Sequence, residues 1–486
     1  MINLFIAFFT VILGALYSNK LPHPLNWITL ILTSAGGFCV LLYKHRKIVL
    51  RFGVLTWTQQ ELCRHILITG DTGSGKTLSG IHPIIIQITR NIPNWGGLVL
   101  GVKGDEHRFI QQLAQTYQRQ DDIIHLQVRP PDTSTKWQPP HRYNLVSDRS
   151  LPWMTHAKAI IDIAASVTEG KQHAFFRPMA QIAIANAFEL LDTMGETVNI
   201  TNAYHILTNK SFTTKRLKQF QNKATTDKQK KLVEFFESTF TKSLAHEQTE
   251  ATTGTIKTYL SFFLDPDIAA VFSSEKPNTF SLSELDHGAI ISVTMPQRLV
   301  TERRYIQTYL KTLFYYHALR RFDLPKEQQD KKNTLFLIAD EFQDIVTSAE
   351  DGISDHKIID RIRSANVAII AAMQSEISPD PAITERKRQV LTLNMRTRFI
   401  FRAADQKGAI ASADFIGKRH FWKKTKSSKP FGQVTISRRK EQEHYVKPSE
   451  LTTLKDHVTI IAHPSKKWIK KKIAPRNGKD KVYSWY

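Results

Sequence analysis

The sequence predicts an α/β fold in which a parallel sheet covered by helices is interrupted by an inserted all-α domain and preceded by a two-helix transmembrane hairpin. From His65 onward, short β-rich apolar runs alternate with helical stretches, which is typical of a parallel sheet. Strand signals fade inside the chain, and two uncharged apolar segments stand near residue 1. The expected boundaries are 1–47 for the hairpin, 151–279 for the all-α domain, and 48–150 with 280–486 for the two parts of the sheet domain.

Two apolar segments make up the predicted hairpin. Residues 2–17 and 25–43 contain no formal charge, and each is about as long as a helix must be to cross the core of a bilayer. Lys20 is the only cation between them, whereas four cations follow between Lys44 and Arg51. The positive-inside rule then places both termini in the cytoplasm. A cleaved signal peptide is the alternative, but the first segment lacks a basic n-region and a second segment follows it.

Seven short apolar runs are the expected strands of the sheet. They span residues 65–70, 97–103, 123–128, 288–296, 334–340, 367–374 and 397–403. The inserted domain falls between the third run and the fourth. Within it, Ala180, Ile184, Phe188 and Leu191 recur at helical spacing and share one face, which predicts an amphipathic helix.

The composition excludes several classes of protein. Lys and Arg number 67 against 44 Asp and Glu, and the net charge of +23 favours anionic partners such as nucleic acid or acidic lipid. Hydrophobic residues form 41% of the chain, while 21 Gly and 20 Pro are too few for a fibrous or low-complexity protein. The two cysteines, Cys39 and Cys63, lack the spacing of a zinc site, so neither a disulfide framework nor zinc is expected to hold the fold.

A phosphate-binding motif occupies residues 70–77. They read GDTGSGKT, which matches GxxxxGK[ST] and lies between a predicted strand and a predicted helix. Its glycines let backbone NH groups turn toward phosphates, and the helix N-terminus adds partial positive charge. Lys76 is expected to reach the β- and γ-phosphates of ATP, and Thr77 to ligate Mg²⁺. The rest of the nucleotide-binding loop is Gly70, Asp71, Thr72, Gly73, Ser74 and Gly75.

An acidic pair follows one of the predicted strands, in TLFLIADEF at residues 334–342. A phosphate-binding loop of this kind needs a carboxylate on a neighbouring strand, to hold the magnesium shell and to polarise the attacking water. Asp340 is the predicted magnesium-shell carboxylate and Glu341 the predicted general base. A helix-capping pair is the alternative, but the presence of GDTGSGKT favours catalysis. The sequence therefore predicts a P-loop ATPase.

Two further polar residues flank the next strand. Gln374 ends that strand, where it could sense the γ-phosphate or orient water. Arg363 lies eleven residues upstream and could reach a neighbouring subunit's nucleotide as an arginine finger. Taken alone, Gln374 is a weak signal, and an exposed arginine at a helix end is the ordinary explanation of Arg363.

The order of these motifs resembles that of the coupling proteins of type IV secretion and conjugation, the TraD/TraG type. The shared features are a two-helix anchor, GDTGSGKT, a helical insertion, LFLIADEF, and an arginine eleven residues before AAMQS. GVKGD at 101–105 is similar to the family's DPKGE segment, and YNLVSD at 143–148 to its NPL segment. Residues 403–418 are similar to its DQ...A...S...G segment and residues 447–463 to its closing pattern, so the resemblance covers nearly the whole chain.

The resemblance implies a RecA-like P-loop NTPase fold and a hexameric ring that uses ATP to deliver DNA, or a relaxase–DNA complex, into a type IV secretion channel. It implies an anchor in the bacterial inner membrane, with the bulk of the chain in the cytoplasm, and contacts with channel components. It also implies that Arg363 is the arginine finger and Gln374 the sensor. One departure is that Gly101 and Val102 stand where the family has Asp-Pro.

Basic residues gather in two segments. Residues 418–440 contain nine Lys or Arg and no acid, with Phe421 and Trp422 among them, a composition suited to phosphate contact and base stacking. Five lysines lie between 466 and 472. Either segment could instead be a solvated surface or contact acidic lipid. The candidate nucleic-acid contacts are Lys423, Lys424, Lys426, Arg438 and Arg439.

Three other functions stay open from the sequence. The same motor could export protein effectors only, in which case DNA would neither stimulate the ATPase nor bind with a steep salt dependence. A membrane-bound DNA pump for partitioning would need no secretion channel. A scaffold that binds ATP only to assemble would show negligible turnover, and Glu341 argues against it.

Overall fold

The computed structural model describes residues 47–481, except 103, 105, 135, 168–175, 223, 242–245, 350–351 and 428–434. The predicted transmembrane hairpin lies outside the described residues but for its last position, so it stays a prediction. Within the described part, no helix has both the length and the apolar character needed to cross a membrane. The chain from Val49 onward forms one compact unit.

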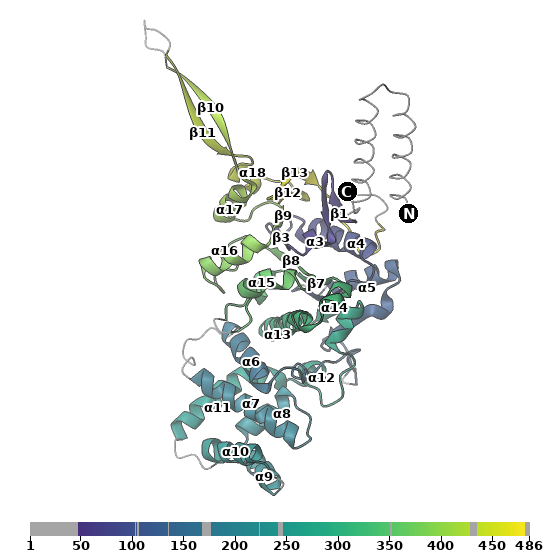
Figure 1. Cartoon of the computed structure of the whole chain (residues 1–486), viewed down its shortest axis with the longest axis vertical. Coiled ribbons are helices and arrows are strands. Elements are labelled where there is room, and N and C mark those ends of the chain that lie inside the picture. The colour runs from purple at the N-terminus through teal and green to yellow at the C-terminus, as the bar shows by residue number, and fades with distance from the viewer. Residues whose placement is uncertain are drawn as a thin grey trace, which may run out of the picture. The chain divides into compact units, whose positions relative to one another are not determined.

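A nine-stranded sheet forms the framework of this unit, in the order β13-β12-β9-β3-β8-β7-β4-β6-β5 (Figure 1). All seven predicted strands belong to it and pair in parallel. The sheet is mixed rather than all parallel, because β12 runs antiparallel to both β9 and β13. The strands are β3 (Ile66–Thr69), β4 (Gly96–Leu100), β5 (Ile123–Gln127), β6 (Ile290–Thr294), β7 (Leu335–Ala339), β8 (Val367–Met373), β9 (Thr397–Ile400), β12 (Val458–His463) and β13 (Lys466–Lys472).

The parallel strands are buried on both faces, which explains their continuous apolar runs. In β7, Leu335 and Leu337 join one hydrophobic cluster, whereas Phe336 and Ile338 join another. Helices α13, α15 and α16 contribute to the first cluster, and α4 and α5 to the second. The helices outside the insertion are α3 (Gln59–Leu62), α4 (His82–Asn91), α5 (Glu106–Tyr117), α13 (Val300–Arg320), α14 (Lys326–Lys331), α15 (Asp355–Arg363), α16 (Glu385–Asn394), α17 (Gln406–Ile416) and α18 (Pro448–Thr452).

The described residues between β5 and β6 form seven α-helices. The predicted apolar face lies on the second of them, where Ala180, Ile184, Phe188 and Leu191 are all buried. The boundaries at 151 and 279 stay predictions, because these helices share one hydrophobic cluster with the sheet. The helices are α6 (Trp153–Val167), α7 (Arg177–Thr193), α8 (Ile200–Thr208), α9 (Lys210–Gln221), α10 (Asp227–Phe236), α11 (His246–Leu260) and α12 (Pro266–Phe272).

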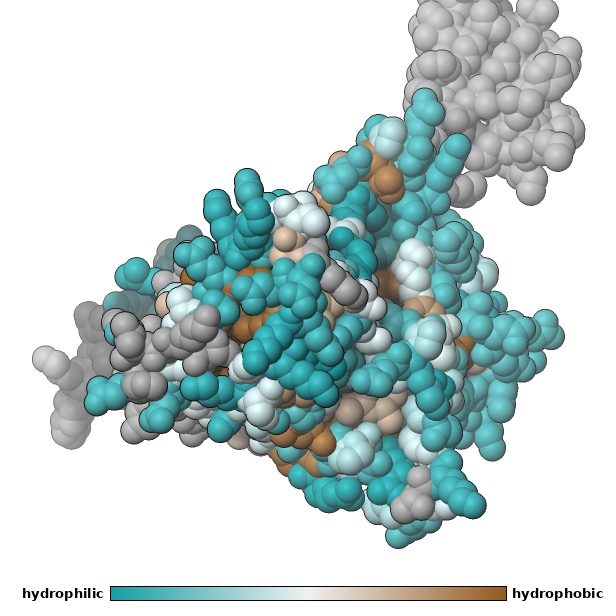
Figure 2. Space-filling view, turned by 90° about the horizontal axis from the view of Figure 1, so that it is seen from below, coloured by the Kyte–Doolittle hydropathy of each residue, from teal (hydrophilic) through white to brown (hydrophobic). Residues whose placement is uncertain are grey.

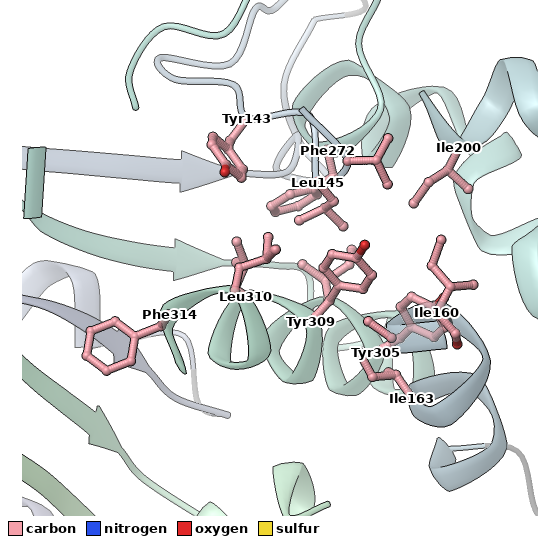
Figure 3. Packing of buried hydrophobic residues seen from close by; sticks show 14 of the residues in the cluster. Tyr143, Leu145, Ile160, Ile163, Ile200, Phe272, Tyr305, Tyr309, Leu310 and Phe314 are labelled. Atoms are coloured by element: carbon pink, nitrogen blue, oxygen red, sulfur yellow. Dashed lines mark hydrogen bonds between the residues drawn. The ribbon is translucent and has the colours of Figure 1, made fainter. Parts of the chain in front are cut away.

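Helix α13 connects the helical insertion to the sheet. Figure 3 shows its Tyr309 and Leu310 next to Leu145, and its Tyr305 next to Ile160 of α6. All five side chains are buried in the same hydrophobic cluster. A shared core of this kind makes movement of the insertion against the sheet costly, because apolar surface would be exposed to water.

Two hairpins complete the fold. β1 (Ile48–Phe52) pairs with β2 (Leu55–Thr58) next to the sheet domain's core, and β10 (Lys418–Ser427) pairs with β11 (Thr435–His444). The two strands of the second hairpin run side by side beyond α17 and α18 (Figure 1). Seen from the side of the helical insertion, the surface is mostly hydrophilic, with small, separate apolar patches (Figure 2). This face therefore offers no large apolar docking surface among the described residues.

Candidate functional site

The GDTGSGKT loop leaves the carboxyl end of β3, as predicted. The helix that follows begins with a single π-helical segment, Lys76–Ile81, which continues into α4. Gly73 and Gly75 have φ angles of +85° and +106°, which only glycine adopts without strain. A Cβ atom at Gly75 would also lie 2.7 Å from Nδ1 of His457. The backbone of the loop thus requires glycine where the motif has it.

Lys76 folds back over the loop that precedes it. Its buried Nζ donates hydrogen bonds to the carbonyl oxygens of Gly70, at 2.8 Å, and Asp71, at 3.0 Å. These bonds hold the ammonium group inside the turn of backbone that the motif uses to surround phosphates. A cation fixed there can be shared with phosphate oxygens without a large movement of the side chain.

Thr77 and Asp340 meet across the sheet. Strand β7, which ends at Ala339, is separated from β3 by β8, but the parallel register brings the carboxyl ends of all three strands to one edge. There the Oγ1 of Thr77 donates to Oδ2 of Asp340 at 2.9 Å. A hydroxyl and a carboxylate are hard oxygen donors, and Mg²⁺ typically takes one or two such groups together with water and substrate phosphates. The pair therefore fits the predicted magnesium shell.

Glu341 has an unusual backbone conformation. Its φ of +54° lies in the left-handed region, which is uncommon for a residue other than glycine. Its NH donates to Oδ1 of Asp340 at 3.1 Å, and its carboxylate accepts from Nε2 of Gln343 at 2.6 Å. Burial and then the neighbouring charge of Glu341 raise the pKa of Asp344 above its usual value. Strained backbone of this kind is typical of functional sites and fits the predicted general base.

The two weaker candidates, Gln374 and Arg363, lie at opposite ends of the parallel strands, on either side of the central strand β8. Gln374 follows β8, its side chain is exposed, and its carbonyl oxygen accepts from the NH of Gly70 at 3.2 Å, so it is adjacent to the phosphate loop. Arg363 ends α15 before β8 begins. Its positive charge contributes to the pKa shifts of Cys63 and His65, whose largest cause is burial, so it lies near these two residues, which precede β3. Arg363 is thus at the amino-end edge of the parallel strands, remote from the phosphate loop of its own subunit.

Two residues that the sequence analysis did not identify support the loop from β9 and β12. Arg402 donates to the carboxylates of Asp71 and Asp456, both at 2.7 Å. His457 donates its backbone NH to the carbonyl oxygen of Ser74 at 2.9 Å, and its ring contacts a serine hydroxyl of the first helical turn. Both supporters lie more than 300 residues from the loop in sequence, so no local pattern could have indicated them.

A buried ion pair connects the turn that follows Glu341 to α15, the helix that ends at Arg363. Lys311 of α13 donates to the carbonyl oxygen of Ile345 and to the carboxylate of Asp355, both at 2.5 Å, and both charged side chains are fully buried. Asp355, the first residue of α15, also accepts from Tyr315 and from both donors of Thr347. Three elements around the site are therefore fixed to one carboxylate.

Replacing Asp355 with asparagine is expected to lower the free energy of unfolding by about 3–5 kcal/mol, because Lys311 would stay in the core without its counter-ion. Urea denaturation of the full chain in detergent, followed by circular dichroism, measures the loss. The matched control is Asp330→Asn in α14, whose ion pair with Lys326 is exposed and contributes little. Equal stability of the two variants would contradict a structural role for the buried pair.

The departure at Gly101 has a local structural consequence. A Cβ atom at this position would lie 2.0 Å from the carboxyl carbon of Glu106, which folds over the glycine. Gln307 and Gln297 hold the carbonyl oxygens of Gly101 and Val102, at 2.8 and 2.9 Å. An aspartate at position 101 would therefore require the carboxylate end of Glu106 to move, which a flexible side chain can do without a change in the backbone.

The candidate nucleic-acid contacts lie on the β10–β11 hairpin. Lys423, Lys424, Arg438 and Arg439 are exposed there, while the side chain of Lys426 is outside the described set. The lysines of β13 differ, because two of them are used within the fold. Their partners are Glu61, which pairs with Lys466, and Glu450, which pairs with Lys470.

Comparison with known proteins gives both a family and a fold. Residues 165–471 match the family model of the type IV secretion-system coupling protein DNA-binding domain, whereas no curated protein matches the sequence. The solved structure of the bacterial conjugative coupling protein TrwBdeltaN70, in an unbound monoclinic form, is 15% identical with a TM-score of 0.63, over 90% of each chain. TrwB in complex with ADP and Mg²⁺ is 17% identical with a TM-score of 0.62, over 91% of this chain and 94% of that one.

A more remote similarity points the same way. VirB4 of Thermoanaerobacter pseudethanolicus is 11% identical with a TM-score of 0.51, over 85% of this chain and 89% of that one. The predicted α/β fold is thus confirmed as a large mixed sheet that matches the P-loop fold of TrwB.

Proposed function

Since the chain belongs to the type IV secretion-system coupling proteins, we propose that it is an ATPase anchored in the bacterial inner membrane that couples ATP hydrolysis to delivery of DNA, or of a relaxase–DNA complex, into a secretion channel. The observation that carries this proposal is the 2.9 Å hydrogen bond between Thr77 and Asp340, beside the ammonium group of Lys76. The three side chains together supply what an ATP–magnesium complex requires from a protein. The ADP and Mg²⁺ bound by TrwB support the same assignment.

The roles of the residues follow from their positions. Lys76 exchanges its backbone carbonyl partners for β- and γ-phosphate oxygens, and Thr77 with Asp340 holds the magnesium shell. Bound Mg²⁺ supplies charge neutralisation on the phosphate oxygens. Glu341 accepts the proton of the attacking water, and Gln374, at the end of the adjacent strand, orients that water.

The position of Arg363 supports a site that is completed between subunits. Within one subunit it lies at the other edge of the sheet from the phosphate loop, so its guanidinium group can act on a nucleotide only in a neighbouring copy. An arginine supplied from a second subunit stabilises the charge that develops on the transferred phosphoryl group. We propose that six copies form a ring, held at the membrane by residues 1–47 and in contact with components of the channel.

The charge of the chain favours DNA over protein as the transported molecule. The net charge is +23, and Lys424, Arg438 and Arg439 of the exposed hairpin have no carboxylate partner among the ion pairs of the described residues. A polyanion is attracted to such a surface, and its binding releases condensed counterions. An acidic protein effector would be attracted less strongly because its charge density is lower.

ATP turnover with and without DNA tests the proposal. The full chain in detergent is expected to hydrolyse ATP faster when single- or double-stranded DNA is added, and the stimulation should weaken between about 0.05 and 0.2 M salt. Lys76→Ala gives the background. Turnover that is indifferent to DNA would contradict a DNA substrate and favour export of protein effectors. A complete lack of turnover in the assembled ring would favour a scaffold that binds ATP only to assemble.

A further inference from the structure

The β10–β11 hairpin has two faces that its register defines. Residues directly opposite each other in an antiparallel pair share a face, and side chains alternate between faces along each strand. The pairing is continuous, with Trp422 opposite Lys440 and Lys424 opposite Arg438. These four residues therefore share one face, which we name the tryptophan face. Its neighbours toward the base of the hairpin are His420 and Gln442, which hydrogen-bond to each other.

The opposite face carries the carboxylates of the hairpin. Glu441 pairs with Lys423 at 3.3 Å, and Glu443 pairs with Arg419 at 3.7 Å and with Lys447 at 2.7 Å. In the register of the two strands, Lys423 and Glu441 are diagonal neighbours and Arg419 lies directly opposite Glu443, so these ion pairs agree with the pairing. The described residues place three cations on this face. Two of them, Lys423 and Arg419, are paired with these carboxylates, and the third, Arg439, has no carboxylate partner among the described ion pairs.

The tryptophan face has a different character. None of Lys424, Arg438 and Lys440 has a carboxylate partner among the ion pairs of the described residues. Trp422 is 65% exposed, which is unusual for a side chain of this size and hydrophobicity. The face therefore combines one exposed aromatic ring with three cations that have no carboxylate partner in the described part of the chain, on a strand pair that extends beyond α17 and α18 (Figure 1).

The arrangement of charges destabilises the hairpin when no ligand is bound to it. Lys424 lies opposite Arg438, and Lys423 lies opposite Arg439, so two successive cross-strand pairs bring like charges together. Like charges in directly opposite positions destabilise an antiparallel pair. An isolated two-stranded hairpin is marginal in water even without such repulsion. The charges are thus explained by an anionic ligand rather than by the stability of the fold.

We propose that the tryptophan face of the β10–β11 hairpin binds single-stranded DNA, with Lys424, Arg438 and Lys440 on successive phosphates and Trp422 stacked on a base. This inference depends on the proposed function, because it assumes that the chain acts on DNA. Bases of single strands are free to stack on an aromatic side chain, whereas those of a duplex are already stacked on one another. Of the five sequence candidates, Lys423 and Arg439 fall on the opposite face, and Lys440 takes their place.

An acidic lipid surface fits the same face less well. Membrane binding of this kind depends on apolar area buried at the headgroup boundary, in addition to charge. The neighbouring positions of Trp422 on this face are His420, Lys424, Lys440 and Gln442, and none of these four side chains is apolar. A single indole suits stacking on one base better than insertion into a bilayer.

Two triple variants with equal charge loss test the face. The first replaces Lys424, Arg438 and Lys440 with glutamine, and the second replaces Arg419, Lys423 and Arg439 with glutamine. Binding of a labelled single-stranded oligonucleotide to the full chain in detergent is measured over a range of salt. The first variant should lose about 2 from the slope of log K against log salt, and about a hundredfold in affinity at about 0.1 M salt, since each phosphate contact contributes about 0.7 to the slope. The second should lose much less.

Trp422→Ala tests the stacking contact separately. It should lower the affinity for single-stranded DNA by about 5- to 100-fold and leave duplex binding unchanged, whereas Trp422→Phe should retain most of the affinity. Equal melting temperatures of all variants show that the fold is intact. An equal loss of single- and double-stranded binding in Trp422→Ala would overturn the assignment of a single-strand site.

The remaining outcomes separate this inference from the proposed function. If the unaltered chain binds DNA and both triple variants bind it equally well, the tryptophan face is excluded while a DNA-coupled ATPase stands. If the unaltered chain binds no DNA, the proposed function itself fails. If the first triple variant binds DNA normally but no longer binds vesicles of phosphatidylserine and phosphatidylcholine, the face belongs to the membrane and the inference is overturned.

Discussion

Replacing Lys76 with alanine should abolish ATP binding and turnover together, whereas replacing Glu341 with glutamine should abolish turnover alone. Lys76 places a positive charge in the phosphate loop, and its loss would leave the β- and γ-phosphates of ATP without their cationic partner. In the proposed mechanism Glu341 serves only the proton transfer, so replacing its carboxylate with an amide should slow hydrolysis by about 10²- to 10⁴-fold and leave ATP bound.

The two variants are compared by calorimetric ATP binding and by phosphate release from the full chain. Gln343→Ala is a matched control for Glu341→Gln, because it removes the 2.6 Å hydrogen bond to the carboxylate but keeps the carboxylate itself. It should retain most of the turnover. Normal ATP affinity in Lys76→Ala, or full turnover in Glu341→Gln, would show that these residues do not have the assigned roles.

Arg363→Ala should lower turnover by about 10³- to 10⁵-fold in assembled rings without changing ATP affinity, the effect of losing an arginine finger. The structure also predicts that two inactive variants can complement each other, because Arg363 and the phosphate loop lie at opposite ends of the parallel strands. A chain with Lys76→Ala has an intact Arg363, and a chain with Arg363→Ala has an intact loop. Mixed rings should therefore contain some complete sites and regain part of the activity.

The mixing experiment needs two further variants. A chain with both Lys76→Ala and Arg363→Ala can supply neither component, so adding it to Arg363→Ala should restore nothing. Arg363→Lys, which keeps the charge near Cys63 and His65, separates catalysis from local structure. If Lys76→Ala fails to rescue Arg363→Ala in rings shown to be mixed, the arginine does not act between subunits.

The parts of this fold that the sequence predicts are those in which one strand or loop carries its own signal. The β7 strand is apolar throughout because both of its faces are covered, and its carboxylates follow at Asp340 and Glu341. The GDTGSGKT loop is recognisable because its glycines are needed for backbone conformation. Such signals are local, and the parallel register then brings them together without further information.

Other features depend on contacts that no short segment records. His457 and Arg402 support the phosphate loop only because β9 and β12 extend the sheet beyond β3. The basic composition of residues 418–440 is visible in the sequence, but the separation of Lys424 from Lys423 onto different faces depends on the strand register. Boundaries of the helical insertion are not evident either, because α13 shares its core with the sheet.

The central claim is that the chain is a motor that moves along DNA. Its most direct test is the dependence of ATP turnover on DNA length, measured with the total concentration of DNA nucleotides fixed at a saturating value. A translocating ring spends more time moving on a long strand before it must rebind, so turnover should rise with length and then level off. Equal turnover on short and long strands, or turnover that DNA does not change, would contradict the account. The same series with Glu341→Gln should show no turnover at any length.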